Sequence, residues 1–226
     1  IRLVRSARRT ASSMRERPSA DFWGLLLDLE SELTEGAQAP LSEAEALQQA
    51  ESALKIAAAL SGLAQENMNR VAGWRFLDMG RRIERGVTTC RLARAFAHDA
   101  ATTDDLDLLL DLCDSQITYR ARYLVGLALT PVRDMVLLDP FNTRSLAFQV
   151  VTLKDHLGNL PALLDDGMLE DPERVLLPLA ADLEIADAGR LDAAEIQRFE
   201  RMLLRLSGEV ADRFFLQGAN AVPTVK

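Results

Sequence analysis

Helix-forming patterns in the long segments constrain the fold of this chain more than any other feature of its sequence. Apolar residues recur at helical spacing, and alternating β-branched runs bounded by hairpin turns are nearly absent. Aromatic residues, which strands favour, make up only 5% of the chain. We therefore predict an all-α helical bundle of roughly seven to nine helices, with more than about 60% helix and no sheet.

Cap residues and helix breakers divide these patterns into segments. Ser42 with Glu45 forms a capping box, and Asp192 before Glu195 begins the last helix. The predicted helices span about residues 1–16, 19–34, 42–71, 74–97, 103–125 and 142–161, and two more begin at about 171 and 192. No internal repeat, low-complexity tract or linker separates them, so we predict one domain over residues 1–226.

The charge of the chain limits its partners. A net charge of −8 argues against nucleic acid, because phosphate binding needs clustered positive charge. The first 17 residues are an exception, with six Arg against one Glu. A helix with a basic, solvent-facing side explains them better than a transit peptide or membrane-surface helix, because the apolar face is weak. No run of 18 apolar residues occurs, so we predict no membrane partner.

The two cysteines, Cys90 and Cys113, lack the spacing of a disulfide framework or a metal site. Each lies on the apolar face of a predicted helix, so we expect two thiols that behave as small hydrophobes. Thiols suit a reducing compartment, and we predict a cytoplasmic location.

The segment of residues 74–86 carries an unusual charge pattern. On a helix, Asp78, Arg81 and Arg85 lie opposite the apolar face, and Glu84 lies on the shoulder between the two faces. Asp78 is placed to meet Arg82 one turn later. A solvated charged face explains the pattern without a function. The functional interpretation is an Arg/Glu cluster in a groove that holds a carboxylate or phosphate.

The segment of residues 114–123 places polar groups in an apolar arc. If residues 103–125 form one helix, Gln116 and Arg120 fall within or at the edge of its buried side, and Tyr119 lies on one flank. A buried Arg needs a partner, so we predict an ion pair between Arg120 and Glu84; a ligand role is the alternative. An acidic stripe on the same segment favours a solvated face over a metal site.

A third polar group begins at Asn142. Ser145, Gln149 and His156 run along one edge of the predicted helix, and Asn142 is interpreted as its cap. A neutral His at such an edge is more often held by a hydrogen bond than used in acid–base chemistry.

Familiar catalytic motifs are missing from the chain. It has no Gly-rich phosphate loop, no GxSxG elbow, no HExxH and no Glu-x-x-His pair. With only two His, a zinc-finger site is excluded as well. We therefore predict no cofactor and no metal, and leave open whether the chain is an enzyme.

Three stretches together resemble a known family. They are residues 65–85, with the run WRFLDMGRRIER, and residues 114–123 and 142–149. The chain is similar over most of its length to the bacterial alpha-E domain family, named for its helices and a recurring Glu-Arg pair. The family motifs correspond to Asp78, Arg81, Glu84, Arg85, Tyr119, Arg120, Asn142, Arg144, Ser145 and Gln149.

The resemblance implies a biological context. Family members accompany a circularly permuted ATP-grasp protein, often with a transglutaminase-like protein and a proteasome-like hydrolase. ATP-grasp enzymes activate a carboxylate as an acyl phosphate and join it to an amine, which implies peptide or amino-acid ligation or modification. Members usually begin with a further helix that carries its own Glu-Arg pair, so we expect this chain to lack that helix.

Two functions follow from these patterns. The leading hypothesis is an accessory helical module that binds the ATP-grasp ligase or its peptide or amino-acid substrate. The alternative is a transferase or ligase component that uses an Arg/Glu cluster to hold an anionic substrate. A metal-dependent hydrolase built on Asp107, Asp111 and Asp114 is a distant third.

Overall fold

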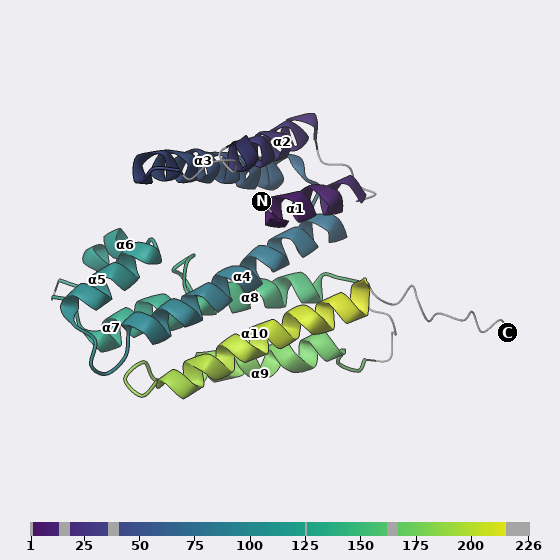
Figure 1. Cartoon of the computed structure of the whole chain (residues 1–226). Helices are drawn as coiled ribbons and strands as arrows, with labels where there is room; N and C mark the ends of the chain where they lie inside the picture. Colours follow the sequence, from purple (N-terminus) through teal and green to yellow (C-terminus); the bar gives the residue numbers. More distant parts are fainter. Residues whose placement is uncertain (1, 14–18, 36–40, 125, 162–166, 216–226) are drawn as a thin grey trace. The chain divides into compact units, whose positions relative to one another are not determined.

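A computed structural model shows a helical protein (Figure 1). It describes residues 2–13, 19–35, 41–124, 126–161 and 167–215. Of these residues 78% are helical, and none of them forms a strand, so the predicted fold class is confirmed. The helices are α1 (Arg2–Ser13), α2 (Ala20–Glu35), α3 (Glu43–Asn67), α4 (Ala72–Phe96), α5 (Thr103–Leu112), α6 (Gln116–Arg122), α7 (Leu129–Arg133), η2 (Asp134–Leu138, a π-helical turn), α8 (Leu146–Gly158), α9 (Asp171–Ile185) and α10 (Ala193–Phe214).

The predicted number of helices is slightly too low. The described residues hold ten α-helices, because the segment predicted as one helix over 103–125 forms both α5 and α6. The short α7 was not predicted, because five residues are too few to show a period. Both predicted helix starts at Ser42 and Asp192 are confirmed, since each side chain accepts a hydrogen bond from the backbone three residues later.

The chain divides into two compact units, residues 1–76 and 77–226. In the first unit, α1 packs on α2, and α2 packs on α3. Glu30 of α2 pairs with Arg8 at 2.9 Å and with Arg5 at 3.6 Å. The basic first helix is therefore joined to its neighbour through part of its arginine face.

In the second unit, α4 lies alongside α8 and α10, and α9 packs against α8 and α10 (Figure 1). Gly86 of α4 makes this close packing possible. A Cβ at this position would lie 2.7 Å from a methyl carbon of Leu203 on α10 and 3.3 Å from one of Leu146 on α8. Since α4 is covered by two helices, it buries more than one of its faces.

A tight turn separates α5 from α6. Asp114 has a φ of 49°, in the left-handed region that few non-glycine residues adopt. The turn ends the helical period of α5 and starts α6 in a different phase.

Both cysteines are free thiols in the core of this unit, as predicted. Among the described residues, no helix is long and apolar enough to cross a membrane.

Candidate functional site

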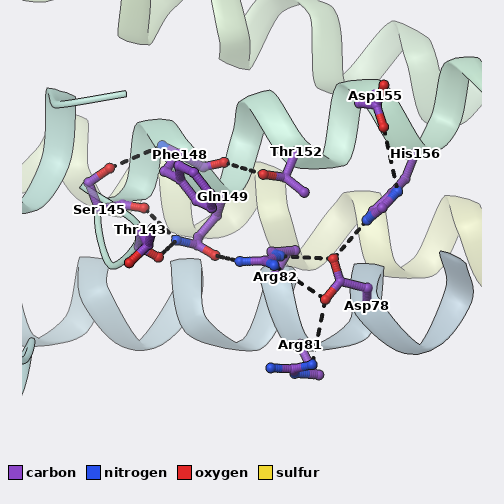
Figure 2. Close-up of polar contacts among 10 residues, drawn as sticks. All are labelled: Asp78, Arg81, Arg82, Thr143, Ser145, Phe148, Gln149, Thr152, Asp155 and His156. Atoms are coloured by element: carbon purple, nitrogen blue, oxygen red, sulfur yellow. Dashed lines mark hydrogen bonds and ion pairs between the residues drawn. The ribbon is translucent and has the colours of Figure 1, made fainter. Parts of the chain in front are cut away.

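Asp78 is the centre of a buried polar network on α4. The residue is only 2% exposed, and its Oδ2 lies 3.0 Å from Nε of Arg82 and 2.8 Å from Nε2 of His156 (Figure 2). A second nitrogen of Arg82 donates to Oδ1 at 3.3 Å, so the pair is bidentate. Arg81 approaches the same oxygen at 3.7 Å. The predicted pairing of Asp78 with Arg82 is confirmed, but Asp78 is buried rather than solvated.

These contacts keep Asp78 ionised. Burial by itself raises the pKa of the carboxyl, but the hydrogen bonds from His156 and Arg82 and the positive charge of Arg82 outweigh it and lower the pKa to about 2. An ionised carboxylate only accepts hydrogen bonds, so Nε2 of His156 carries the proton and donates it to Asp78. A carboxylate with so low a pKa is a weak general base near neutral pH.

Gln149 continues the network along α8. It is fully buried; its amide nitrogen donates to the carbonyls of Ser145 at 2.8 Å and Thr143 at 3.0 Å, and its Oε1 accepts from Arg82 at 3.2 Å (Figure 2). Both donors of the amide group and its oxygen therefore bond to the protein. The network links the middle of α4 to the first turn of α8.

Ser145, and not Asn142, is the N-cap of α8. Its Oγ accepts from the backbone of Phe148 at 3.0 Å. Asn142 is buried and donates to the Met135 carbonyl at 2.9 Å and to Oγ of Ser115 at 3.1 Å. The prediction that Asn142 caps this helix is wrong, because its Oδ1, the atom that a cap would use, accepts instead from the backbone N–H of Arg144 at 3.1 Å, before the helix begins.

Arg85 and Arg144 lie beside this network. Arg144 directly precedes the Ser145 cap, and one of its Nη atoms is 2.6 Å from Oδ2 of Asp114. Arg85 is partly buried on α4 and makes no hydrogen bond or ion pair with another described residue. Burial and the positive charges of Arg144, Arg82 and Arg81 together lower the pKa of Arg85.

The predicted ion pair between Glu84 and Arg120 does not form. Arg120 is an exposed residue of α6 whose Nη2 lies 3.7 Å from Asp107, and Glu84 is exposed on α4. The turn at Asp114 is the physical reason, because it rotates α6 away from the phase expected for one continuous helix. The prediction that Arg120 belongs to a buried arc is therefore wrong.

Several residues of the 114–123 segment line a separate small pocket of about 170 Å³. Arg120, Gln116 and the buried Tyr119 line it together with Asp107, and Gln116 donates to the Asp107 carbonyl at 3.4 Å. No residue of α4 lines this pocket. The sequence candidates thus fall into two groups, one on α4 and α8 and one on α5 and α6.

The first group offers binding chemistry. In the part of the chain that the structure describes, no cluster of three or more His, Cys, Asp or Glu side chains is placed to hold a metal ion. Both thiols have raised pKa values because they are buried, about 12 for Cys90 and about 11 for Cys113, so neither is an activated nucleophile. What the residues on α4 and α8 offer a ligand is guanidinium groups with unused hydrogen-bond donors.

Comparison with known families identifies the family of this chain. Residues 1–215 match the Alpha-E family, described as a predicted alpha-helical domain with a conserved ER motif. The chain belongs to the alpha-E family. The match extends across both compact units of the structure, and no solved structure matches the chain.

Relatives of this alpha-E chain occur in mycobacteria. An uncharacterized protein of Mycobacterium tuberculosis and another of Mycobacterium bovis are each 33% identical to it over 159 residues. The match covers 67% of this chain and 18% of each relative. In both relatives the similar region is thus a small part of a longer polypeptide.

The sequence analysis missed two features of this alpha-E chain. The pairing of Arg82 with Asp78 was predicted, but its further contact with Gln149 was not. Glu200 of α10 was missed altogether; it is buried between Arg91 at 2.7 Å and Arg94 at 2.6 Å of α4. Glu200 lies within the apolar face of α10, which is a signal that a helical projection of that segment would show. A glutamate in such a position needs cationic partners.

Proposed function

We propose that this alpha-E chain is an accessory helical module of an ATP-grasp-linked peptide or amino-acid ligation system. In this role it binds the circularly permuted ATP-grasp ligase or its substrate. The partner and the reaction class come from the family resemblance, and the binding role is supported by the site on α4 and α8.

Arg85 is the observation that carries the binding role. Its guanidinium is partly buried near three other arginines and has no acceptor among the described residues. A guanidinium taken from water without an acceptor destabilises the protein, and an arriving carboxylate or phosphate would supply that acceptor. Asp78, the one carboxylate at the centre of the network, is already bound by Arg82 and His156.

The length of the relatives supports a module rather than a complete system. The alpha-E segment makes up 18% of each mycobacterial relative, which leaves most of those chains for other domains. The two buried thiols suit a reducing compartment, and we propose a cytoplasmic location.

Reconstitution tests this function. The chain, the ATP-grasp protein of the same organism, and the two together are incubated with ATP and amino-acid mixtures, and ADP and ligated products are measured. We expect no turnover by the chain alone, and either a stable complex or faster ligation when both are present. Turnover by the chain alone that Arg81→Ala or Arg120→Ala abolishes in folded protein would instead support an enzyme.

A further inference from the structure

The stripe of α4 that faces the start of α8 contains Arg85. Arg82 contacts Gln149 at 3.2 Å, Gly86 lies against Leu146, and the hydroxyl of Thr89 donates to the carbonyl of Arg144 at 3.5 Å. Position 85 lies three residues after Arg82 and four before Thr89, so it belongs to the same stripe. Arg85 thus lies on the side of α4 that faces the start of α8, and the positive charge of Arg144, which precedes that helix, helps to lower the pKa of Arg85.

The first turn of α8 makes this location electropositive. Backbone N–H groups at a helix N-terminus carry a partial positive charge, and α8 is 13 residues long. Arg144 stands immediately before this helix, and its side chain is partly exposed. A partly buried guanidinium beside a second guanidinium and a helix N-terminus is unfavourable unless an anion lies between them.

The balance of charge indicates what kind of anion fits. Arg81 and Arg82 share the carboxylate of Asp78, Arg144 pairs with Asp114, and Arg85 forms no ion pair with any carboxylate of the described residues. Four guanidinium groups therefore face two carboxylates, which leaves two positive charges. Glu84 is exposed and forms no ion pair with these arginines.

A phosphate group matches this excess of two positive charges better than a carboxylate does. A phosphate monoester carries a charge of about −1.5 to −2 near neutral pH, whereas a carboxylate carries one negative charge. Its three terminal oxygens also accept from several donors at once, and forked donors come from Arg85 on α4 and from Arg144 in the turn before α8.

We propose that Arg85 and Arg144 bind the phosphate group of a small molecule at the first turn of α8. The inference rests on the proposed function in giving the alpha-E chain a binding role, and it adds the chemistry of the ligand. Arg82 is a positioning residue and does not bind the phosphate itself, because its donors are bound to Asp78 and Gln149.

Calorimetric titration of the isolated chain tests the proposal. Inorganic phosphate, ADP and acetate are titrated in a phosphate-free buffer near neutral pH into wild type, Arg85→Ala and Arg85→Lys. Arg205→Ala is the matched control, because Arg205 is an exposed arginine of α10 that pairs with Glu209. We expect Arg85→Ala to weaken phosphate or ADP binding about tenfold or more, and the control to leave it unchanged.

Arg85→Lys keeps the fold testable if Arg85→Ala unfolds. It retains the charge and loses the forked donors, so we expect intermediate binding. Tighter Arg85-dependent binding of ADP than of phosphate supports a nucleotide, and equal binding supports a free phosphate group. Acetate binding as tight as phosphate, equal losses in Arg85→Ala and Arg205→Ala, or no binding of phosphate and ADP overturns the proposal.

The same protein preparations separate this inference from the proposed function. If wild type binds neither phosphate nor ADP but still forms a complex with the ATP-grasp protein, the phosphate site is wrong and the accessory role stands. If phosphate binds through Arg85 but no complex and no effect on ligation are found, the site stands and the accessory role is wrong.

Discussion

Replacing Asp78 by Asn removes one charge from the buried network and keeps the shape of the side chain. The folded protein lowers the pKa of Asp78 from 3.8 to about 2. Each pKa unit corresponds to about 1.4 kcal/mol, so ionised Asp78 stabilises the fold by about 2 kcal/mol at neutral pH. We expect Asp78→Asn to lower the free energy of unfolding by about this amount, since Arg82 and His156 lose their charged acceptor.

The loss should depend on pH. Because the pKa is lower in the folded state, the stabilisation is complete well above pH 3.8 and disappears as the pH falls through about 2. At about pH 3 roughly half of it remains in the wild type. The gap in stability between wild type and Asp78→Asn should therefore shrink from about 2 kcal/mol at neutral pH to about 1 kcal/mol at pH 3.

Urea unfolding followed by circular dichroism measures both values. Glu84→Gln is the matched control, because Glu84 lies on the same helix but is exposed and unpaired among the described residues. We expect that change to alter stability by less than about 0.5 kcal/mol. If Asp78→Asn is as stable as wild type at neutral pH, or if the gap does not change between neutral pH and pH 3, the structural reasoning about Asp78 is refuted.

Two further predictions concern packing and the thiols. Gly86→Ala should destabilise the protein by about 1–3 kcal/mol, because the new methyl group would lie 2.7 Å from Leu203. Gly80→Ala on the same helix is the control; its methyl group meets nothing within 4 Å, so this change should be neutral or stabilising. Urea unfolding of both variants measures the two effects. Cys90 and Cys113 should resist a thiol reagent in the native protein and react fully in denaturant, because both are buried with raised pKa values; rapid reaction of either thiol in the native state would contradict its burial.

Helix starts could be predicted because a cap is a local device. The Ser42 hydroxyl and the Glu45 carboxylate are three residues apart, and both of their reciprocal hydrogen bonds form as expected. Asn142 and Ser145 show the limit of this reasoning. Both residue types favour the N-cap, and only the surroundings decide that Asn142 bonds to Ser115 and Met135.

The break after α5 could not be predicted from the sequence. No Gly or Pro marks it, and the apolar spacing of α5 continues into α6 as if one helix covered both. Asp114 adopts a left-handed conformation, which changes the phase of all later side chains. Ile117, which a single helix over 103–125 would place on the same side as Leu106, Leu109 and Cys113, is consequently 87% exposed.

The burial of Asp78 escaped prediction for a different reason. A helical projection assumes one buried face, and on α4 that face holds Met79, Ile83 and Val87. The opposite side of α4 is covered as well, because His156 and Gln149 of α8 reach Asp78 and Arg82 there. Only the tertiary arrangement decides which charged face of a helix is enclosed.

The candidate residues on α4 and α8 differ in how many of their hydrogen-bond donors and acceptors the protein already uses. Gln149 uses both amide donors and its oxygen within the protein, and Asp78 is bound by Arg82 and His156. Side chains so fully engaged stabilise the fold and have little to offer a ligand. Arg85 is the opposite case, with five donors and no acceptor among the described residues, so its substitution should affect binding far more than stability.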